Sequence, residues 1–156
     1  MKAIYPGSFD PITYGHLDII ERAAEIFDEV VIVIMKNDGK QSLFSDEEKL
    51  EMINECIKDM HNVSVMVGSG LTVEFAKSIG ATIMVRGIRA VTDYEYEMQL
   101  ATANMSLDDS IHTVFLASRP EYSFLSSSVA KTVASCHGDI SHFVPPCVQT
   151  KLQERY

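Results

Sequence analysis

The chain has 156 residues, a formal net charge of −9 from 22 acidic and 13 basic residues, and three cysteines. A chain of this length buries roughly 70% of the surface that its unfolded form exposes, so it needs no disulfide framework. The acidic balance argues against extended contacts with nucleic acid or with an anionic membrane. A small anionic substrate is still compatible with it, because cations in one cleft act locally while distant charges are screened.

The first residues and the cysteines indicate a cytoplasmic protein. The opening MKAIYPGSF lacks the apolar core of a signal peptide, and the longest aliphatic run, residues 30–35, is too short to span a bilayer. An odd number of cysteines, Cys56, Cys136 and Cys147, favours free thiols in a reducing compartment over secretion. We therefore expect a protein that is not exported and has no membrane partner.

A strand, a turn and a helix are expected at the start of the chain. Residues 2–5 are partly β-branched or aromatic, which is typical of a strand. After the glycine-rich turn, apolar residues recur at helical spacing and leave charged residues largely on the opposite face. The apolar stripe is Leu17, Ile20, Ala24 and Phe27, and the residues expected opposite it are Asp18, Glu21, Arg22 and Glu25.

Strand and helix patterns then alternate without a linker. The continuous apolar run at 30–35 is typical of a parallel strand covered on both faces. Short connections between alternating elements predict an α/β fold, a doubly wound five-stranded parallel sheet with C-terminal helices, in one domain over residues 1–156. Ligands of such folds bind beyond the carboxyl ends of the strands. Further strands are expected at 63–67, 82–85 and 112–117, and helices after a capping box at Ser45 and Glu48, over 71–79, over about 92–107, after residue 120 and after residue 146.

Two common phosphate-binding motifs are absent from the sequence. A Walker A loop around Gly39 and Lys40 would need a glycine five positions before Gly39 and Ser or Thr after Lys40, and neither is present. A dinucleotide-binding G-x-G-x-x-G that starts at Gly68 has Val73 in place of its third glycine. A nucleotide site must therefore be built from other loops.

Four loops carry residues that suit an anion. The loop GSFDPITYGH, residues 7–16, offers Ser8, backbone N–H groups and His16 in the first helical turn. Lys40 lies in the second loop. The third places two arginines around a glycine, RGIR at 86–89, directly after a buried strand, as a fork for phosphate oxygens. The fourth, SSSVAK at 126–131, has three serines and a lysine at a helix start, donors that suit a polyphosphate.

Each of these residues also has an ordinary structural role open to it. His16 could be a core or surface histidine, and Lys40 a solvated loop lysine. Arg89 could pair with Asp93 or Glu97, and one serine would suffice as a helix cap. From the single loops alone, these alternatives stay open.

Two further features are not expected to carry chemistry. The region from Cys136 to Cys147 offers zinc-type ligands, but it lacks a C-x-x-C pair, so no metal site is expected there. The stripe formed by Met98, Met105 and neighbouring alanines is expected to belong to the core or to a subunit interface.

The loops taken together resemble a known family. Thr13-Tyr14-Gly15-His16 is similar to the [T/H]-x-G-H signature of the nucleotidyltransferases, and SSSVAK to their S-S-[ST]-x-x-[RK] signature. The string RGIRAVTDYEYEMQLATANMSL, residues 86–107, narrows the resemblance to the phosphopantetheine adenylyltransferases of bacterial coenzyme A biosynthesis. The similarity runs from residue 3 to about residue 144 and implies a Rossmann-like nucleotidyltransferase fold.

This resemblance implies a reversible reaction of ATP with 4′-phosphopantetheine that gives dephospho-coenzyme A and pyrophosphate. The substrate phosphate would attack the ATP α-phosphate directly. Because this nucleophile is already ionised, the site needs alignment and charge neutralisation but no base. The resemblance also implies Mg²⁺ carried mainly by the ATP phosphates, a homohexamer, and coenzyme A as a feedback ligand. A sister enzyme acting on nicotinamide mononucleotide or a polyol phosphate, and a nucleotide sensor without catalysis, are the alternatives.

The same resemblance assigns roles to the loop residues. His16 would stabilise the transition state at the α-phosphate, with Lys40 and Arg89 as further catalytic residues. Ser8 and Tyr14 stand where the family often has threonine and asparagine, which leaves the hydrogen bonding of the first loop open. Phosphopantetheine would meet Ser8, Lys40, Thr72 and Arg86, and ATP would be held by Ser8, Phe9, His16, Gly87, Ile88, Arg89, Glu97, Tyr122, Ser123, Phe124, Leu125, Ser126, Ser127 and Ser128.

Overall fold

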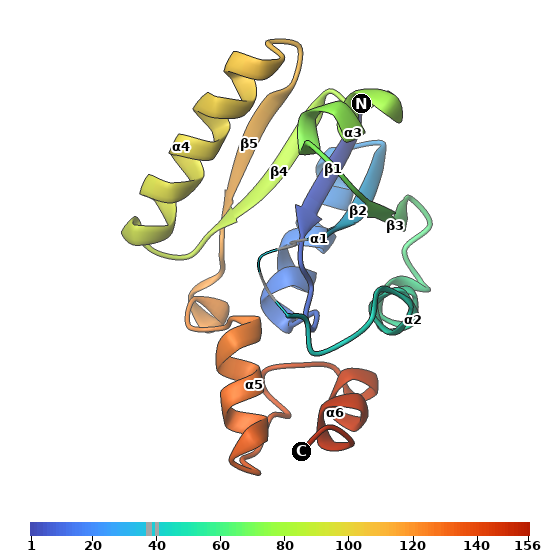
Figure 1. Ribbon diagram of the computed structural model, residues 1–156, viewed down its shortest axis with the longest axis vertical. Helices are drawn as coiled ribbons and strands as arrows, with labels where there is room; N and C mark the ends of the chain where they lie inside the picture. Colours follow the sequence, from blue (N-terminus) through green and yellow to red (C-terminus); the bar gives the residue numbers. More distant parts are fainter. Residues whose placement is uncertain (37–38, 40) are drawn as a thin grey trace.

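The computed structural model describes residues 1–36, 39 and 41–156, and a parallel sheet of five strands forms its centre (Figure 1). The order of the strands is β3-β2-β1-β4-β5, so the predicted α/β fold with a five-stranded parallel sheet is confirmed. The strands are β1 Lys2–Gly7, β2 Glu29–Met35, β3 Val63–Gly68, β4 Ile83–Ile88 and β5 His112–Ala117.

Helices connect the strands and cover the sheet. Ser45 caps α2 as expected, because its hydroxyl accepts the Glu48 N–H at 3.2 Å and the Glu48 carboxylate accepts the Ser45 N–H at 2.9 Å. In the described part of the chain, no helix is both long and apolar enough to cross a membrane. The helices are α1 Tyr14–Ile26, α2 Asp46–Ile57, α3 Thr72–Ser78, α4 Val91–Leu107, α5 Ser127–Ser135 and α6 Pro146–Gln153, with a 3-10 turn η1 at Pro120–Tyr122.

The core lies on both faces of the sheet. On one face, alternate residues of β1 and β2 pack against α1, α2, α5 and α6, and on the other face the intervening residues pack against α3. Figure 1 shows α5 and α6 beyond the end of the sheet at which β1 ends. The three cysteines are free thiols, as expected, and the sulfur atoms of Cys56 and Cys147 lie 3.7 Å apart between α2 and α6.

β1 and β4 separate toward their carboxyl ends. Their paired residues are Ala3 with Ile83 and Ile4 with Met84, although β1 continues to Gly7 and β4 to Ile88. The chain winds outward from β1 through β2 to β3 and then returns to β4 on the other side of β1. This pair of strands is therefore the switch point at which ligands of such sheets bind.

The structure corrects two expectations from the sequence. Arg86–Ile88 was expected to be loop, but it continues β4 and pairs with Phe115–Ala117 of β5. Asp18 was expected on the polar face of the first helix, but it is 3% exposed. Its carboxylate pairs with Arg22 and with Arg119, which follows β5. Helical periodicity cannot show a partner that lies about a hundred residues further along the chain.

Candidate active site

A cavity of about 260 Å³ opens where β1 and β4 separate. Its wall is made by the carboxyl ends of these two strands, the first turn of α1, and the start of α5. Three of the four predicted loops therefore meet at one place. The predicted site residues that line it are Ser8, Phe9, His16, Arg86, Gly87, Arg89, Glu97, Leu125, Ser126 and Ser127.

Two neighbouring cavities account for further predicted residues. One of about 620 Å³ shares Ser8 and Ser127 with the first and adds Ser128. A small one of about 80 Å³ is lined by Thr72 together with Arg86 and Glu97. Lys40 lies outside the described residues. Ile88, Tyr122, Ser123 and Phe124 are not among the residues that line these cavities, and the Phe124 ring packs edge-on against Phe143 at 5.6 Å.

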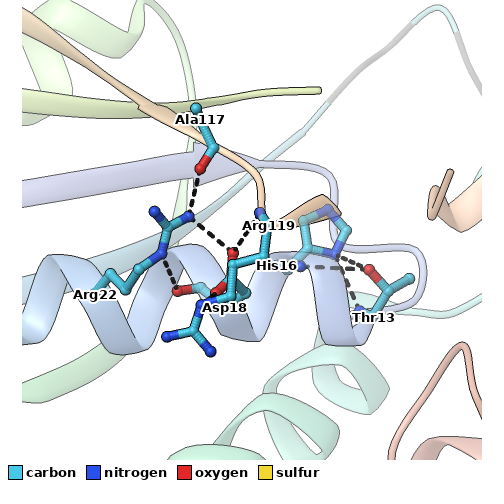
Figure 2. A network of polar contacts seen from close by, with 6 residues as sticks. All are labelled: Thr13, His16, Asp18, Arg22, Ala117 and Arg119. Atoms are coloured by element: carbon cyan, nitrogen blue, oxygen red, sulfur yellow. Dashed lines mark hydrogen bonds and ion pairs between the residues drawn. The ribbon is translucent and has the colours of Figure 1, made fainter. Parts of the chain in front are cut away.

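The cap of α1 fixes the ring of His16. Thr13 is the N-cap residue, and its hydroxyl accepts the His16 N–H at 3.4 Å. In return, the Thr13 backbone N–H donates to His16 Nδ1 at 3.0 Å, as Figure 2 shows. A ring nitrogen that accepts a backbone N–H carries no proton, so the neutral ring holds its proton on Nε2. His16 is therefore prepared to donate from Nε2.

His16 is a neutral donor at physiological pH. Burial, together with the charges of Arg89 and Arg86, lowers the pKa of its imidazole to about 4. The ring can therefore donate a hydrogen bond from Nε2 but carries no positive charge at this pH. An N–H group that needs no proton transfer is suited to an oxygen on which negative charge develops.

Phe9 holds the other side of the same ring. The Phe9 and His16 ring centroids are 5.0 Å apart in an edge-on arrangement, and Phe9 is 1% exposed. Its backbone has φ of 45°, a left-handed conformation that is strained for a residue other than glycine. Phe9 therefore contributes to the site by supporting the His16 ring.

Acidification is expected to destabilise the fold through His16. An unfolded histidine has a pKa near 6.5 and this one is held near 4, so the unfolded state binds more protons between these values. The free energy of unfolding should therefore fall with pH in this window, by about 2 kcal/mol from pH 7 to pH 4.5. Urea unfolding at pH 7, 5.5 and 4.5 measures it. His16→Asn should lose this component of the pH dependence, whereas a substitution of the exposed His112 should keep it.

Arg86 spans the gap between β1 and β4. Its Nε and Nη2 atoms donate to the Glu97 carboxylate, both at 2.6 Å, and Nη1 donates to the Pro6 carbonyl at 2.8 Å. Glu97 comes from α4 and is 8% exposed. The fork that the sequence suggested for phosphate is thus occupied by a carboxylate of the protein. Three of the five N–H donors of the guanidinium are used, and two remain.

Arg89 takes the role that the sequence left open as an alternative. Its Nε lies 3.1 Å from Oδ2 of Asp93, one turn into α4. Its Nη1 donates to the backbone carbonyl of Leu125, just before α5. Arg89 therefore ties the end of β4 to the loop that precedes α5, in addition to placing a positive charge beside the cavity.

The serines at the start of α5 also have structural partners. Ser126 caps the helix by accepting the Val129 N–H at 3.1 Å, and the Ser127 hydroxyl donates to the Pro11 carbonyl at 2.8 Å. The bond to Pro11 attaches α5 to the first loop. The backbone N–H groups of Ser127 and Ser128, at the start of the helix, are the donors that this helix can offer to an anion.

Asp10 connects three segments beneath the site. Its carboxylate accepts the backbone N–H groups of Leu43 and Phe44 at 2.9 and 3.0 Å, and Lys131 Nζ at 3.1 Å. Although burial opposes the effect, these contacts hold the pKa of Asp10 below its usual value. Lys131, which the sequence suggested for a polyphosphate, is therefore partly neutralised by Asp10.

Sequence reasoning missed the roles of Thr13 and Asp10. Thr13 stands three residues before His16, the spacing of a capping box, and this signal could have predicted the contact with the His16 ring. Nothing in the sequence indicates the partners of Asp10, because Leu43, Phe44 and Lys131 contact it through the tertiary fold.

The chain is similar over most of its length to a known protein family and to several named relatives. The chain matches the cytidylyltransferase-like family over residues 4–133. It is 54% identical over 156 residues to a phosphopantetheine adenylyltransferase of Gloeothece citriformis, covering 100% of this chain and 99% of the relative. Relatives with the same name are 50% identical over 153 residues in Lachnoclostridium phytofermentans, with 98% and 94% covered, and 46% identical over 154 residues in Caldanaerobacter subterraneus subsp. tengcongensis, with 99% and 96% covered.

A solved structure shows that the fold is shared more widely. A protein of Vibrio parahaemolyticus, described as a candidate nicotinate-nucleotide adenylyltransferase, superposes with a TM-score of 0.70 over 98% of this chain and 91% of its own. The two sequences are 17% identical, so this likeness shows the fold alone. It supports a nucleotidyltransferase-like fold for the chain.

Proposed function

The chain belongs to the phosphopantetheine adenylyltransferase family, and on this premise we propose that the cavity between β1 and β4 is its active site. The enzyme transfers an adenylyl group from ATP to 4′-phosphopantetheine, a step of coenzyme A biosynthesis. The substrate phosphate would attack the α-phosphate of ATP in line. The observation that carries the proposal is the convergence of His16, Arg86 and the start of α5 on one cavity.

His16 would stabilise the transition state by donating a hydrogen bond from Nε2. A base is not needed, because the attacking phosphate is already ionised. The geometry also argues against a base, since Nδ1 of His16 already accepts the Thr13 N–H. As the α-phosphorus becomes five-coordinate, charge grows on its oxygens, and a preorganised donor then contributes most.

The two substrates would enter from different sides of Arg86. On the ATP side lie Ser8, residues 87–89 and Glu97, with the 122–128 segment. On the phosphopantetheine side, Arg86, Thr72 and Ser8 would be joined by Lys40, whose assignment rests on the family resemblance. The small cavity lined by Thr72 supports a place for the pantetheine arm there, because it combines apolar side chains with one amide and two hydroxyl groups beside the Arg86–Glu97 pair. Its other lining residues are Pro6, Met84, Arg86, Glu97, Leu100, Ala101, Asn104 and Thr113.

Mg²⁺ is proposed to arrive on the ATP phosphates. Among the described residues, no group of three His, Cys, Asp or Glu side chains is placed to hold a metal ion. Two carboxylates that line these cavities are already paired, Asp10 with Lys131 and Glu97 with Arg86. This donor set fits an ion that keeps its waters and takes few protein ligands. The ion would offset negative charge on the leaving pyrophosphate.

A homohexamer is proposed from the family resemblance, and the exposed face of α4 supports contacts between copies. Met98 and Met105 are 39% and 56% exposed, so this stripe does not belong to the core of the chain. Clustered apolar side chains of this kind mark contact surfaces. Light scattering should report six chains, and a monomer would contradict the proposal. The other exposed apolar residues of α4 are Val91, Tyr94, Tyr96 and Leu107.

A cytoplasmic location, a single domain over residues 1–156 and feedback by coenzyme A complete the proposal. α5 and α6 contribute Ala130, Ala134, Val148 and Leu152 to the same core as the sheet, which supports one folding unit. Coenzyme A differs from the reaction product by one phosphate, so it is expected to compete for the same cavity. Inhibition that phosphopantetheine fails to relieve would argue against binding there.

Pyrophosphate release tests the function. ATP is offered with 4′-phosphopantetheine, nicotinamide mononucleotide or glycerol 3-phosphate in separate reactions, and release is expected with the first alone. Release with another acceptor would favour a sister enzyme. ATP binding without turnover on any acceptor would favour a nucleotide sensor.

Replacement of Gly15 is expected to leave the stability of the fold nearly unchanged and to weaken the binding of ATP. A Cβ at this position would lie 3.5 Å from Leu125 Cβ and 3.5 Å from Thr13 Oγ1, which are ordinary contacts. Gly15→Ala should therefore keep the free energy of unfolding within about 1 kcal/mol, since alanine also favours the helix. The added methyl group lies on the cavity wall, so the KM for ATP should rise severalfold. Urea unfolding and steady-state kinetics measure the two effects, and an unchanged KM would contradict the role of this close approach.

A further inference from the structure

α1 carries a buried carboxylate that the proposed chemistry does not use. Asp18 lies two residues after His16 and is 3% exposed. A buried carboxylate is costly unless it is paired, so its partners indicate what it stabilises. Those partners come from α1 itself and from the segment after β5, as Figure 2 shows.

Arg22 joins Asp18 to the end of β5. Its Nη2 donates to Asp18 Oδ2 at 2.8 Å and to the carbonyl of Ala117 at 2.7 Å. Ala117 is the last residue of β5. The carboxylate thus holds the guanidinium over the point where the chain leaves the sheet.

Arg119 brings the next segment to the same carboxylate. Its Nε lies 3.1 Å from Asp18 Oδ1, and its backbone N–H lies 3.4 Å from Oδ2. Oδ1 has no partner with hydrogen-bond geometry among the described residues, so its contact with Arg119 is an ion pair without a directed bond. The Arg119 side chain is 53% exposed, and it approaches the carboxylate from outside.

The segment that begins at Arg119 depends on a few anchors. Tyr122 donates its N–H to the Arg119 carbonyl at 2.9 Å, and Leu125 donates to the Tyr122 carbonyl at 3.0 Å. Leu125 is the one buried residue of the described segment 119–126. Its carbonyl receives the contact from Arg89. The segment is thus held at its start by Asp18 and at its end by Arg89, and between these anchors the Phe124 ring packs against Phe143 at 5.6 Å.

We propose that Asp18 is a positioning residue for ATP binding, which acts through Arg119 on the segment 119–126. The inference rests on the proposed function, because that function places ATP against residues 122–128. His16 and Arg86 are oriented by Thr13 and Glu97, so they do not depend on Asp18. Loss of the anchor should therefore weaken binding of ATP and leave the chemical step nearly unchanged.

Arg119→Gln is the first test, because the Arg119 side chain is half-exposed and its replacement leaves the core intact. The KM for ATP should rise about tenfold, with kcat within about twofold and the KM for phosphopantetheine unchanged. Lys151→Gln is the matched control, since it breaks another long-range ion pair, with Glu51 at 3.2 Å, that lies outside the site. It should change none of the three parameters.

Asp18→Asn tests the carboxylate itself. Its effect on the KM for ATP should be at least as large as that of Arg119→Gln, because the backbone N–H of Arg119 also loses a charged acceptor. The double variant should show much less than the product of the two single effects, since both act at one contact. Independent, multiplying effects would contradict action through Arg119.

The dissociation constant of ATP, measured by calorimetry, separates this inference from the proposed function. If the wild type binds ATP but releases no pyrophosphate, the proposed function fails, while the comparison of dissociation constants still tests the anchor. An unchanged ATP affinity in Arg119→Gln overturns the inference, and so does a fall in kcat at unchanged KM. Circular dichroism establishes that each variant is folded, and if Asp18→Asn is not, Arg119→Gln and its control decide.

Discussion

Replacement of His16 by alanine is expected to lower kcat about a hundredfold or more and to change the KM for ATP by less than about threefold. The reason is the state of the ring. With its pKa lowered to about 4 and Nδ1 occupied by Thr13, His16 presents one neutral N–H, and such a donor matters most when charge has grown on the phosphoryl oxygens. Steady-state pyrophosphate release gives both constants.

His16→Gln distinguishes the chemical role from the capping role. Glutamine at the third helical position can accept the Thr13 N–H as His16 does, so it preserves the capping box and the stability of α1. It does not place a ring N–H in the cavity. We therefore expect stability near that of the wild type together with a loss of turnover close to that of the alanine variant. Substitution of His112, which is exposed at the start of β5, should change neither. Equal losses in kcat and ATP affinity in the alanine variant would contradict the assigned role.

The fold and the place of the site could be predicted because they follow from local patterns. Apolar runs and helical stripes determine which segments become strands and helices, and the order of elements then restricts the topology to a doubly wound sheet. The rule that ligands bind beyond the carboxyl ends of strands brought the first loop, RGIR and SSSVAK to one edge. The structure places residues of all three loops around one cavity.

The electrostatic state of the site could not be predicted, because it depends on partners distant in the sequence. The low pKa of His16 arises from burial and from Arg86 and Arg89. The burial of Asp18 likewise depends on Arg119, which lies about a hundred residues further along the chain and contacts its carboxylate. A single helix pattern contains neither contact.

The end of β4 differs from the loop expected there for a related reason. A charged residue followed by glycine is typical of a loop, yet here Arg86 is satisfied within the strand by Glu97 and the Pro6 carbonyl. Gly87 favours close packing and does not serve a turn, since a Cβ there would lie 3.1 Å from Cγ1 of Ile19. The signals that suggested a loop are thus consequences of the site built on this strand.

The ion pair of Arg86 and Glu97 leads to the second large prediction. Arg86→Met is expected to lower kcat/KM about a thousandfold or more, whereas Glu97→Gln should lower it only about tenfold. Both variants break the same pair, at 2.6 Å and little exposed, so both should lose about 2 kcal/mol of stability. Urea unfolding and pyrophosphate release measure the two quantities.

The asymmetry in activity follows from the charge that each variant leaves behind. Without Arg86, the Glu97 carboxylate remains unpaired beside a cavity that must accept two anionic substrates. Without the Glu97 charge, the positive charge of Arg86 is left without a partner, and a bound phosphate can neutralise it.

The double variant Arg86→Met with Glu97→Gln should therefore be more active than Arg86→Met alone, a rescue that a purely structural pair would not give. As a control, Glu55→Gln breaks an exposed pair with Lys58 and should change neither stability nor turnover. Equal losses of activity in the two single variants would mean that Glu97 contributes an interaction of its own to catalysis, beyond orienting Arg86.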